Sequence, residues 1–302
     1  KGGIETGLII AKCQGNTITV HSDRCLAADY YTSERITDQE RQDLLFSSWQ
    51  VVCHASQVSD PGCLFPFELH GQSYFLARGK DGVLRGFANV CPHRGHQLIA
   101  TSTNKSAIVC PYHAWTFDLN GGLRGARGVS KQDQACERNL FPIAVTEQLG
   151  FVFVNQSNKA EPFETFAPNL REQVLAACPS LLEYQLNSAD TELGHSYICQ
   201  ANWKVMIDNY LECYHCQTAH GDFQEMMALS QSQFKLFDNF TYQWAPTKHK
   251  SQNLAFPLDL EHDVLVGEFW WLFPNMTLAF FQACRTFTSR ALTQSRRTKP
   301  QE

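Results

Sequence analysis

The spacing of apolar residues changes along the chain and divides it into segments of different predicted structure. From Ser33 onward, acidic residues come first and apolar residues follow as far as Trp49, which predicts an amphipathic helix capped by Ser33. Between residues 50 and 155, short apolar runs are divided by Gly, Pro, Asn and Asp, which indicates a small antiparallel β domain with hairpins. Within it, residues 118–122 predict a tight turn and residues 150–155 the last strand.

A polar stretch at residues 156–168, with two prolines, separates this β segment from the rest of the chain. Beyond it, residues 170–177 and 203–216 have helical spacing, whereas residues 269–281 are aromatic and β-branched enough to form a sheet. From about residue 282 the sequence becomes polar, basic and without pattern. We therefore expect an α+β protein, with a small all-β domain and a mixed domain in which helices flank an antiparallel sheet.

Length and composition agree with two domains. With 302 residues, of which 43% are hydrophobic, the chain can bury a substantial core, and its length suggests about two domains. We expect an N-terminal arm and helix at residues 1–49 that packs on the second domain. The β domain is then expected at residues 50–160 and the mixed domain at residues 161–302.

Charge and cysteine content limit the expected partners and compartment. The net charge is −5 and no basic stripe is interleaved with aromatic residues, so nucleic acid is not an expected partner. No apolar run approaches the roughly 20 residues of a membrane-spanning helix, and no secretory signal follows Lys1, although an upstream segment could be missing. The 12 cysteines are too scattered for a disulfide framework, so we expect a cytoplasmic protein with reduced thiols. Most of the cysteines are expected to be small buried apolar residues: Cys13, Cys25, Cys53, Cys63, Cys136, Cys178, Cys199 and Cys284.

Two short segments each contain one Cys and one His. Cys91 and His93 form the first pair, and Cys110 and His113 form the second, with sixteen residues between the two pairs. A structural zinc finger instead groups a Cys pair and then a His pair. If the two loops hold a two-iron cluster from opposite sides, the two thiolates bind one iron and the two imidazoles the other, which is the Rieske arrangement. A zinc site, or two unrelated Cys–His pairs, is the alternative.

A second group of candidate ligands lies at residues 202–220. At about 100° per residue, Asp208, Glu212 and His215 project from one helical face, and such a face is costly to bury without a partner or a metal. His220 follows about 140° further round an ideal helix, so the two histidines reach one ion only if the helix distorts or ends between them.

This group indicates a mononuclear iron site. Two imidazoles and one carboxylate, with positions left open, form the facial triad of non-haem Fe(II) oxygenases. Asp208 is then expected to orient a liganding imidazole or to pass protons. The alternative for Cys213 and Cys216, which form a C-x-x-C, is a redox or zinc pair.

Both constellations resemble one known family. Residues 91–95 and 110–123 closely resemble the cluster loops of the Rieske non-haem iron oxygenases. Residues 212–220, with an acid three residues before the first His and a second His shortly after, resemble the family's mononuclear-iron motif. The resemblance implies an oxygenase (α) subunit with a Rieske [2Fe–2S] domain and a catalytic domain.

The resemblance also implies roles and partners. His215 and His220 would bind mononuclear Fe(II), and Glu212 would bridge by hydrogen bonds toward a cluster histidine of a neighbouring subunit, although most members have aspartate at this position. Electrons would come from NAD(P)H through a flavin/iron–sulfur reductase or a ferredoxin, and O₂ would be activated at the mononuclear iron to oxidise a small-molecule substrate. The expected assembly is a head-to-tail homotrimer.

The third iron ligand has no match. In the family it is an Asp on a C-terminal helix, and the candidates that remain here by residue type are Asp222, Asp238, Asp259, Asp263 and Glu268. We therefore expect the chain to be an incomplete or frame-altered version of a longer enzyme, which binds mononuclear iron weakly while it keeps its cluster. Iron held by two histidines and water is the alternative.

Residues 208–216, with glutamate as the bridging acid, look most like the oxygenases of quaternary ammonium compounds such as carnitine, glycine betaine, stachydrine and choline. The expected reaction is hydroxylation or N-demethylation. A trimethylammonium group needs an aromatic cage. The candidates for its walls are Trp244, Trp270, Trp271, Phe280 and Phe281. An oxygenase of aromatic rings on the same metals is one alternative, and a non-catalytic or electron-transfer Rieske protein is another.

Overall fold

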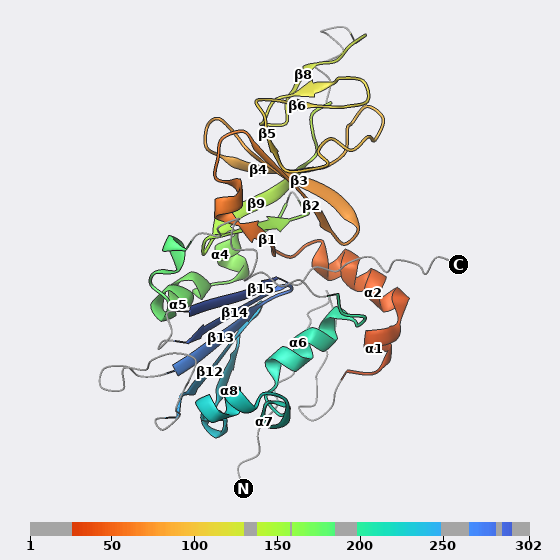
Figure 1. Cartoon of the computed structure of the whole chain (residues 1–302). Helices are drawn as coiled ribbons and strands as arrows, with labels where there is room; N and C mark the ends of the chain where they lie inside the picture. The colour runs from red at the N-terminus through yellow and green to blue at the C-terminus, as the bar shows by residue number, and fades with distance from the viewer. Residues whose placement is uncertain are drawn as a thin grey trace. The chain divides into compact units, whose positions relative to one another are not determined.

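The computed structural model (Figure 1) describes residues 26–129, 138–157, 159–184, 198–248, 266–281 and 286–291. Two compact units divide the chain. One is built around Ser47–Leu175, and the other combines the segment that ends at Phe46 with the segment that begins at Cys199. No described helix is long and apolar enough to cross a membrane.

The unit around Ser47–Leu175 is organised by an antiparallel sheet with the strand order β1-β10-β9-β4-β3-β2-β5 in the described part of the chain. The strands are β1 (Gln50–His54), β2 (Cys63–Leu69), β3 (Gln72–Arg78), β4 (Leu84–Ala88), β5 (Thr103–Asn104), β9 (Pro142–Gln148) and β10 (Phe151–Asn155). All five residues of β10 are buried, in keeping with its uninterrupted run of Phe and Val. The β domain and its last strand are thus confirmed.

A smaller sheet, β6-β7-β8, extends the same unit. Its strands are β6 (Ile108–Val109), β7 (Thr116–Phe117) and β8 (Leu123–Gly125). The predicted tight turn joins the last two: the Asp118 carboxylate accepts from the amides of Asn120 and Gly122 at 2.9 and 2.8 Å, and Gly121 has a φ of 87°. A Cβ at Gly121 would lie 2.5 Å from the Phe87 ring, so this turn requires glycine.

The candidate cluster cysteines belong to the hydrophobic core of this unit. Leu64, Phe75 and Phe117 are fully buried there, in one cluster with Cys91 and Cys110. The short helices of this part of the chain are η2 (Ala55–Val58), α4 (Phe163–Phe166), α5 (Leu170–Ala177) and η3 (Leu181–Glu183). The predicted helix at residues 170–177 is confirmed by α5.

The other unit contains a second antiparallel sheet, ordered β11-β12-β13-β14-β15 among the described residues. Its strands are β11 (Gln233–Leu236), β12 (Phe240–Pro246), β13 (Val266–Leu272), β14 (Met276–Phe281) and β15 (Thr286–Ala291). The sheet predicted at residues 269–281 is confirmed. The prediction that the chain has no pattern after residue 282 is wrong, because β15 pairs with β14 over its whole length, and Thr and Phe favour a strand.

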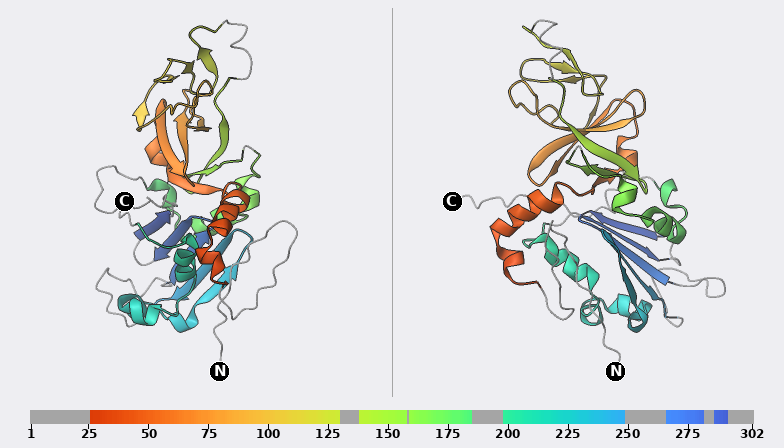
Figure 2. Two further views of the ribbon diagram at one scale, coloured as in Figure 1. Left: turned by 90° about the vertical axis from the view of Figure 1, so that its right-hand side faces the viewer. Right: turned by 180° about the vertical axis from the view of Figure 1, so that it is seen from behind.

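Helices lie beside this sheet (Figures 1 and 2). They are α1 (Asp29–Thr32), α2 (Glu34–Glu40), the π-helical turn η1 (Arg41–Leu45), α6 (Trp203–Leu211), α7 (Cys216–Ala219), α8 (Gly221–Met226) and η4 (Leu229–Gln231). The predicted cap is confirmed, since the Ser33 hydroxyl oxygen accepts from the Ile36 amide at 3.4 Å. Phe223 of α8 packs edge-on against Phe269 and Phe281 of the sheet.

The predicted helix at residues 203–216 ends early. α6 stops at Leu211, and Glu212 is extended, with φ −113° and ψ 152°. The Tyr210 hydroxyl donates to the carbonyl oxygens of Trp270 and Leu278 at 3.0 and 3.1 Å, which ties the end of α6 to the sheet. The expectation that Asp208, Glu212 and His215 share one helical face is therefore wrong.

Candidate metal centres

The two Cys–His loops have the same backbone hydrogen bonds. In the first loop, the Cys91 amide donates to the His96 carbonyl at 2.8 Å, and the Gly95 amide donates to the Cys91 carbonyl at 2.9 Å. The second loop has the same two bonds: the Cys110 amide donates to the Trp115 carbonyl at 2.8 Å, and the Ala114 amide donates to the Cys110 carbonyl at 3.0 Å. The fifth residue of each loop has a positive φ: Gly95 at 70° and Ala114 at 57°. Each loop therefore places a cysteine in the core and turns back over it, and each lies between two strands as predicted.

The two imidazoles lie side by side and each has an aromatic neighbour. The ring centroids of His93 and His113 are 4.8 Å apart. Trp115 stacks on His93 with centroids 4.6 Å apart and an interplanar angle of 3°. Tyr112 lies against His113 with centroids 3.8 Å apart. The loops thus bring together the two histidines that the sequence analysis paired.

The donor set fits a cluster. Cys91 and Cys110 are 1% and 2% exposed, and burial, with a further contribution from the Cys110 thiol, raises the pKa of Cys91. Desolvation, then the charges of His113, Arg94 and Arg138, lowers the pKa of His93, which favours the neutral imidazole that ligates metals. Two adjacent buried thiolates need a cation to compensate them, and a two-iron cluster supplies one.

An orphaned nitrogen supports the same fit. His113 Nδ1 is buried and has no hydrogen-bond partner among the described residues. Buried polar atoms are nearly always satisfied, so an imidazole nitrogen left open beside a second histidine is compatible with a role as a ligand atom. Within the described ranges, no three His, Cys, Asp or Glu side chains converge as they would around a single ion. A cluster that takes two protein ligands on each iron does not require such convergence.

Asn89 closes the first loop from inside the core. Its amide nitrogen donates to the Ile99 carbonyl at 2.6 Å and to the Ser73 hydroxyl at 3.1 Å. Its amide oxygen accepts from the amides of Leu98 and Ile99 at 3.1 and 2.9 Å. Asn89 is 4% exposed. Its side chain therefore holds the two ends of the loop that carries Cys91 and His93.

The second candidate centre lies in the turn after α6. The imidazoles of His215 and His220 meet edge to face, with ring centroids 5.1 Å apart. His215 is the residue before α7 and His220 the residue after it, so the chain changes direction between Leu211 and His215 and again at His220. The condition stated for the two histidines was a helix that distorts or ends between them. The structure goes further, because α6 ends at Leu211, before His215, and the short α7 ends at Ala219, before His220.

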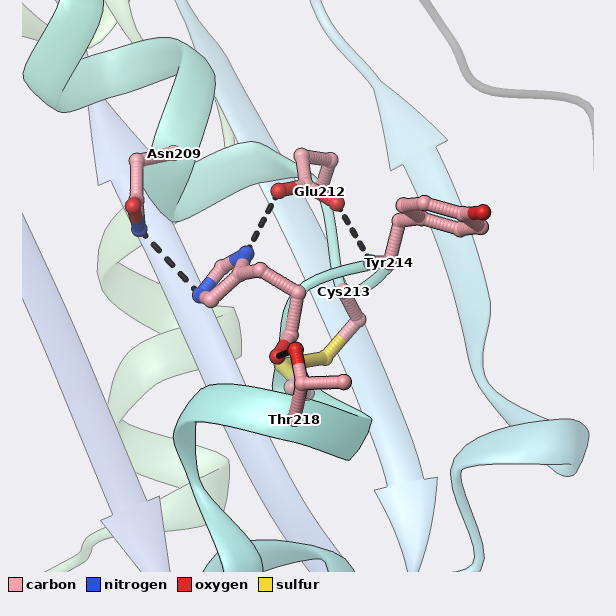
Figure 3. Close-up of a disulfide and its surroundings, with 7 residues drawn as sticks. Asn209, Glu212, Cys213, Tyr214 and Thr218 are labelled. Atoms are coloured by element: carbon pink, nitrogen blue, oxygen red, sulfur yellow. Dashed lines mark hydrogen bonds and ion pairs between the residues drawn. A yellow bond between two sulfur atoms is a disulfide. The ribbon is translucent and has the colours of Figure 1, made fainter.

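His215 is held by hydrogen bonds on both ring nitrogens. Glu212 Oε1 lies 2.5 Å from His215 Nδ1, and its other oxygen accepts from the Tyr214 amide (Figure 3). The Asn209 amide nitrogen lies 3.2 Å from His215 Nε2. If Nδ1–H donates to Glu212, the lone pair is on Nε2, which is the orientation given by a carboxylate behind a metal-binding histidine.

Cys213 and Cys216 form a disulfide across this turn (Figure 3). Their Cα atoms are 5.0 Å apart, and the Cys216 amide also donates to the Cys213 carbonyl at 3.2 Å. The expectation of reduced thiols is wrong at this pair, because the end of α6 and the start of α7 bring the two side chains together. Cys53 is buried as expected, Cys63 and Cys178 are partly buried, and Cys199 is exposed, contrary to expectation. The other four, Cys13, Cys25, Cys136 and Cys284, lie outside the described residues.

A cavity of about 640 Å³ adjoins the turn. Its lining includes Glu212, His215, His220, Asp222, Phe223 and Phe269. Of the aromatic residues proposed for a cage, Trp244 lines the cavity. Trp270, Trp271 and Phe280 do not, and they are buried at 1%, 3% and 3%. Phe281 is not part of the lining either. Trp270 and Trp271 are consecutive on β13, so their side chains lie on opposite faces of the sheet, and Trp270 stacks on Tyr242 of the neighbouring strand.

The carboxylates take different positions from those expected. Asp208 accepts from the Tyr31 hydroxyl at 2.5 Å, and it is Glu212 that contacts an imidazole. Of the candidates for the third ligand, Asp222 lines the cavity, whereas Glu268 accepts from the Tyr242 hydroxyl at 2.6 Å. Asp259 and Asp263 lie outside the described residues.

Helices α1 and α2 brace α6. The Lys204 ammonium donates to both Glu40 carboxylate oxygens at 2.8 and 2.7 Å, and the Trp203 indole N–H reaches the same carboxylate at 3.3 Å. Tyr31 adds its bond to Asp208 four residues along α6. The N-terminal helices thus fix the segment that leads into the candidate iron site. Neither Tyr31 nor Asn209 has a spacing that would have marked it in the sequence.

Two family models match the chain. Residues 48–142 match the Rieske [2Fe–2S] domain, and residues 186–292 match the catalytic domain of the ring-hydroxylating alpha subunit. The two matched domains imply an iron–sulfur cluster and iron.

Individual relatives agree with both matches. The carnitine monooxygenase oxygenase subunit of Escherichia coli K12 is 36% identical over 234 residues, which cover 76% of this chain and 61% of the relative. The glycine betaine monooxygenase oxygenase subunit of Chromohalobacter salexigens is 30% identical over 200 residues, covering 66% of this chain and 43% of the relative. This chain therefore spans less than two thirds of the length of either.

A solved structure matches as well. It is a quaternary ammonium Rieske monooxygenase studied for carnitine oxidation and inter-subunit electron transfer. The match has a TM-score of 0.70 at 32% identity, and it covers 83% of this chain and 67% of that one.

Proposed function

Because the chain belongs to the Rieske non-haem iron oxygenases, we propose that it is an oxygenase subunit that uses O₂ and reductase-supplied electrons to hydroxylate or N-demethylate a quaternary ammonium compound. The observation that carries the proposal is the pairing of two buried thiols and two adjacent imidazoles in one unit with a histidine-lined cavity of about 640 Å³ in the other. We retain the domain boundaries at residues 50–160 and 161–302 as part of the proposal.

Each group of side chains has a proposed task. Cys91, Cys110, His93 and His113 would hold the [2Fe–2S] cluster, and His215 and His220 the mononuclear Fe(II). When bound, the cluster supplies electrons one at a time and the ferrous ion activates O₂. The core around the two thiols excludes water from one side of the cluster, since both are almost fully buried.

The turn after α6 orients the second site. Glu212 takes a hydrogen bond from His215 Nδ1, which keeps Nε2 available as a ligand atom. Asn209 occupies the Nε2 side at 3.2 Å, so its amide must move when that nitrogen ligates. Asp222 lines the same cavity and is the carboxylate we propose as the third ligand, but it does not converge with the two histidines in the described part of the chain, so its side chain would have to move to ligate.

The cavity wall suits a cation. Phe223 and Phe269 present aromatic rings, and Glu212 and Asp222 add carboxylates, whereas the described lining has no Lys or Arg. Aromatic rings and acidic groups attract a trimethylammonium group, which can donate no conventional hydrogen bond. Carnitine and glycine betaine, the substrates named for the relatives, are therefore the first compounds to test.

The remaining partners complete the proposal. Electrons come from NAD(P)H through a flavin/iron–sulfur reductase or a ferredoxin, and the assembly is a cytoplasmic homotrimer. Glu212 would carry the hydrogen-bonded bridge to a cluster histidine of a neighbouring subunit with the oxygen that now accepts from the Tyr214 amide.

The test is a turnover assay with a reductase, NADH, O₂ and carnitine, glycine betaine or benzoate. Formaldehyde or hydroxylated product from either ammonium compound supports the proposal. Product from benzoate alone would replace it with an aromatic-ring oxygenase, and NADH consumption without product from any substrate would favour an electron-transfer protein. Iron and acid-labile sulfide are measured on the same preparation, because a chain without labile sulfide cannot perform this function.

A further inference from the structure

We infer that Cys213 and Cys216 form a thiol–disulfide exchange site, and that its disulfide state fixes His215 for metal binding. The inference of an exchange site depends only on the structure of this turn. Its effect on metal binding rests on the mononuclear centre of the proposed function.

The disulfide closes the short turn that carries the imidazole. His215 lies between the two cysteines in sequence, and Glu212 immediately precedes the first of them. One Glu212 oxygen contacts the His215 ring and the other contacts the Tyr214 amide, so a single carboxylate joins the imidazole to the backbone of the turn. The disulfide closes that same turn, and it therefore limits how far the carboxylate and the imidazole can separate.

The pair is also placed for exchange. Cys213 is exposed, whereas Cys216 is 4% exposed, and both line the cavity. An incoming thiolate can thus reach the Cys213 sulfur, with Cys216 as the buried leaving group. A loop this short gains little fold stability from cross-linking, because the entropic effect of a disulfide grows with the length of the closed loop. The role that remains for this disulfide is to fix the local geometry of the turn.

The reductant is a dithiol and the oxidant a peroxide. One thiolate of the dithiol attacks Cys213 Sγ, the Cys213–Cys216 bond breaks, and Cys216 leaves and takes a proton. The second thiol of the reductant then displaces Cys213, so two electrons and two protons pass to the pair and the reductant becomes a disulfide. In the reverse direction, hydrogen peroxide converts one thiol to a sulfenic acid and water. The second thiol then closes the disulfide with loss of another water.

The first experiment maps the thiols of the full chain by alkylation and mass spectrometry. In protein oxidised with one equivalent of hydrogen peroxide, Cys213 and Cys216 are expected to resist alkylation while Cys199, an exposed free cysteine, reacts. After dithiothreitol treatment of the folded protein, both are expected to become labelled. Labelling of both cysteines in the peroxide-treated protein would overturn the exchange site.

The second experiment titrates the apo protein with cobalt(II) in each state and follows its visible absorption. Loss of a group that orients a metal-binding histidine typically costs about 10-fold or more in affinity, so we expect reduction to raise the cobalt dissociation constant about 10-fold. The Cys213→Ser/Cys216→Ser double variant should bind like the reduced protein under both conditions. Cys199→Ser should keep the wild-type response, and circular dichroism checks that every form is folded.

The outcomes separate this inference from the proposed function. Equal or tighter cobalt binding after reduction overturns the coupling and leaves the mononuclear centre in place. An intense thiolate-to-cobalt band in the reduced protein would also overturn the coupling, because the two cysteines would then bind the metal themselves. Cobalt binding in neither state contradicts the mononuclear centre and, with it, the coupling.

Discussion

The indole of Trp115 lies parallel to the imidazole of His93, with ring centroids 4.6 Å apart. Trp115 is 2% exposed, and the Arg138 guanidinium lies 5.5 Å from the centroid of its ring. The orientation of one proposed cluster ligand is therefore supported by a core side chain that is not itself a proposed ligand.

Replacing Trp115 should loosen the cluster. In Trp115→Leu the ring contact with His93 is lost and a cavity remains, and we expect faster release of acid-labile sulfide and a free energy of unfolding lower by about 2 kcal/mol. Sulfide release over time and urea denaturation check both effects. Trp115→Phe, which keeps a ring, is the matched control and should retain sulfide longer. A leucine variant that holds its sulfide as long as the wild type would contradict the stacking role.

The two metal centres should be separable by mutation, because their donor sets share no residue. Cys91→Ser is expected to lose acid-labile sulfide and the visible spectrum of the cluster while it still binds cobalt(II) in the cavity. His215→Ala should show the opposite pattern, with sulfide unchanged and cobalt binding weakened. Loss of sulfide in His215→Ala, with the fold intact by circular dichroism, would show that the assignment of ligands is wrong.

The Lys204–Glu40 ion pair should matter for stability. Both side chains are about nine-tenths buried, so Lys204→Met leaves an uncompensated carboxylate, with an expected loss of about 3 kcal/mol in the free energy of unfolding. The double variant Lys204→Met/Glu40→Leu should recover most of it. The control pair Arg41–Asp38 is exposed, so Arg41→Ala should cost less than about 1 kcal/mol. A similar loss in both single variants would argue against a special role for the buried pair.

The free energy of unfolding should decrease at acidic pH because of His54. Its Nδ1 accepts from the Ser56 amide at 3.2 Å, and burial lowers its pKa below 6.5 in the folded protein. The unfolded chain therefore binds the proton more tightly than the folded protein does. The free energy of unfolding that His54 contributes is fully present above pH 6.5, and it is lost as the pH falls through 6.5 toward the folded-state pKa. Urea midpoints measured across this range should drop for the wild type. The drop should be smaller in His54→Gln, and equal drops would exclude His54 as the cause.

The sequence predicted the β domain, the helix cap at Ser33 and the two Cys–His loops, because each has a local signature in the chain, even though the first strand of the β domain pairs with its last. The end of α6 could not be predicted in the same way, since residues 203–216 contain neither Gly nor Pro. The helix stops where Tyr210 bonds to carbonyls of the sheet, about sixty residues further along the chain. The contact between Glu212 and His215 follows from that break rather than from helical spacing.

The walls of the cavity were predicted only in part. Trp244 lines it, but Trp270, Trp271 and Phe280 do not, because aromatic content alone does not say which face of a strand is covered. Phe223 and Phe269, which do line the cavity, meet across α8 and β13. Such a pairing between a helix and a strand has no signature in a single sequence.

The Asn89 side chain has a consequence for which substitutions the first loop tolerates. Its four hydrogen bonds use both the amide oxygen and the amide nitrogen, so an aspartate at this position could not donate to the Ile99 carbonyl. The loop that carries Cys91 and His93 is therefore sensitive to a nearly isosteric change at a residue that is not one of the proposed ligands.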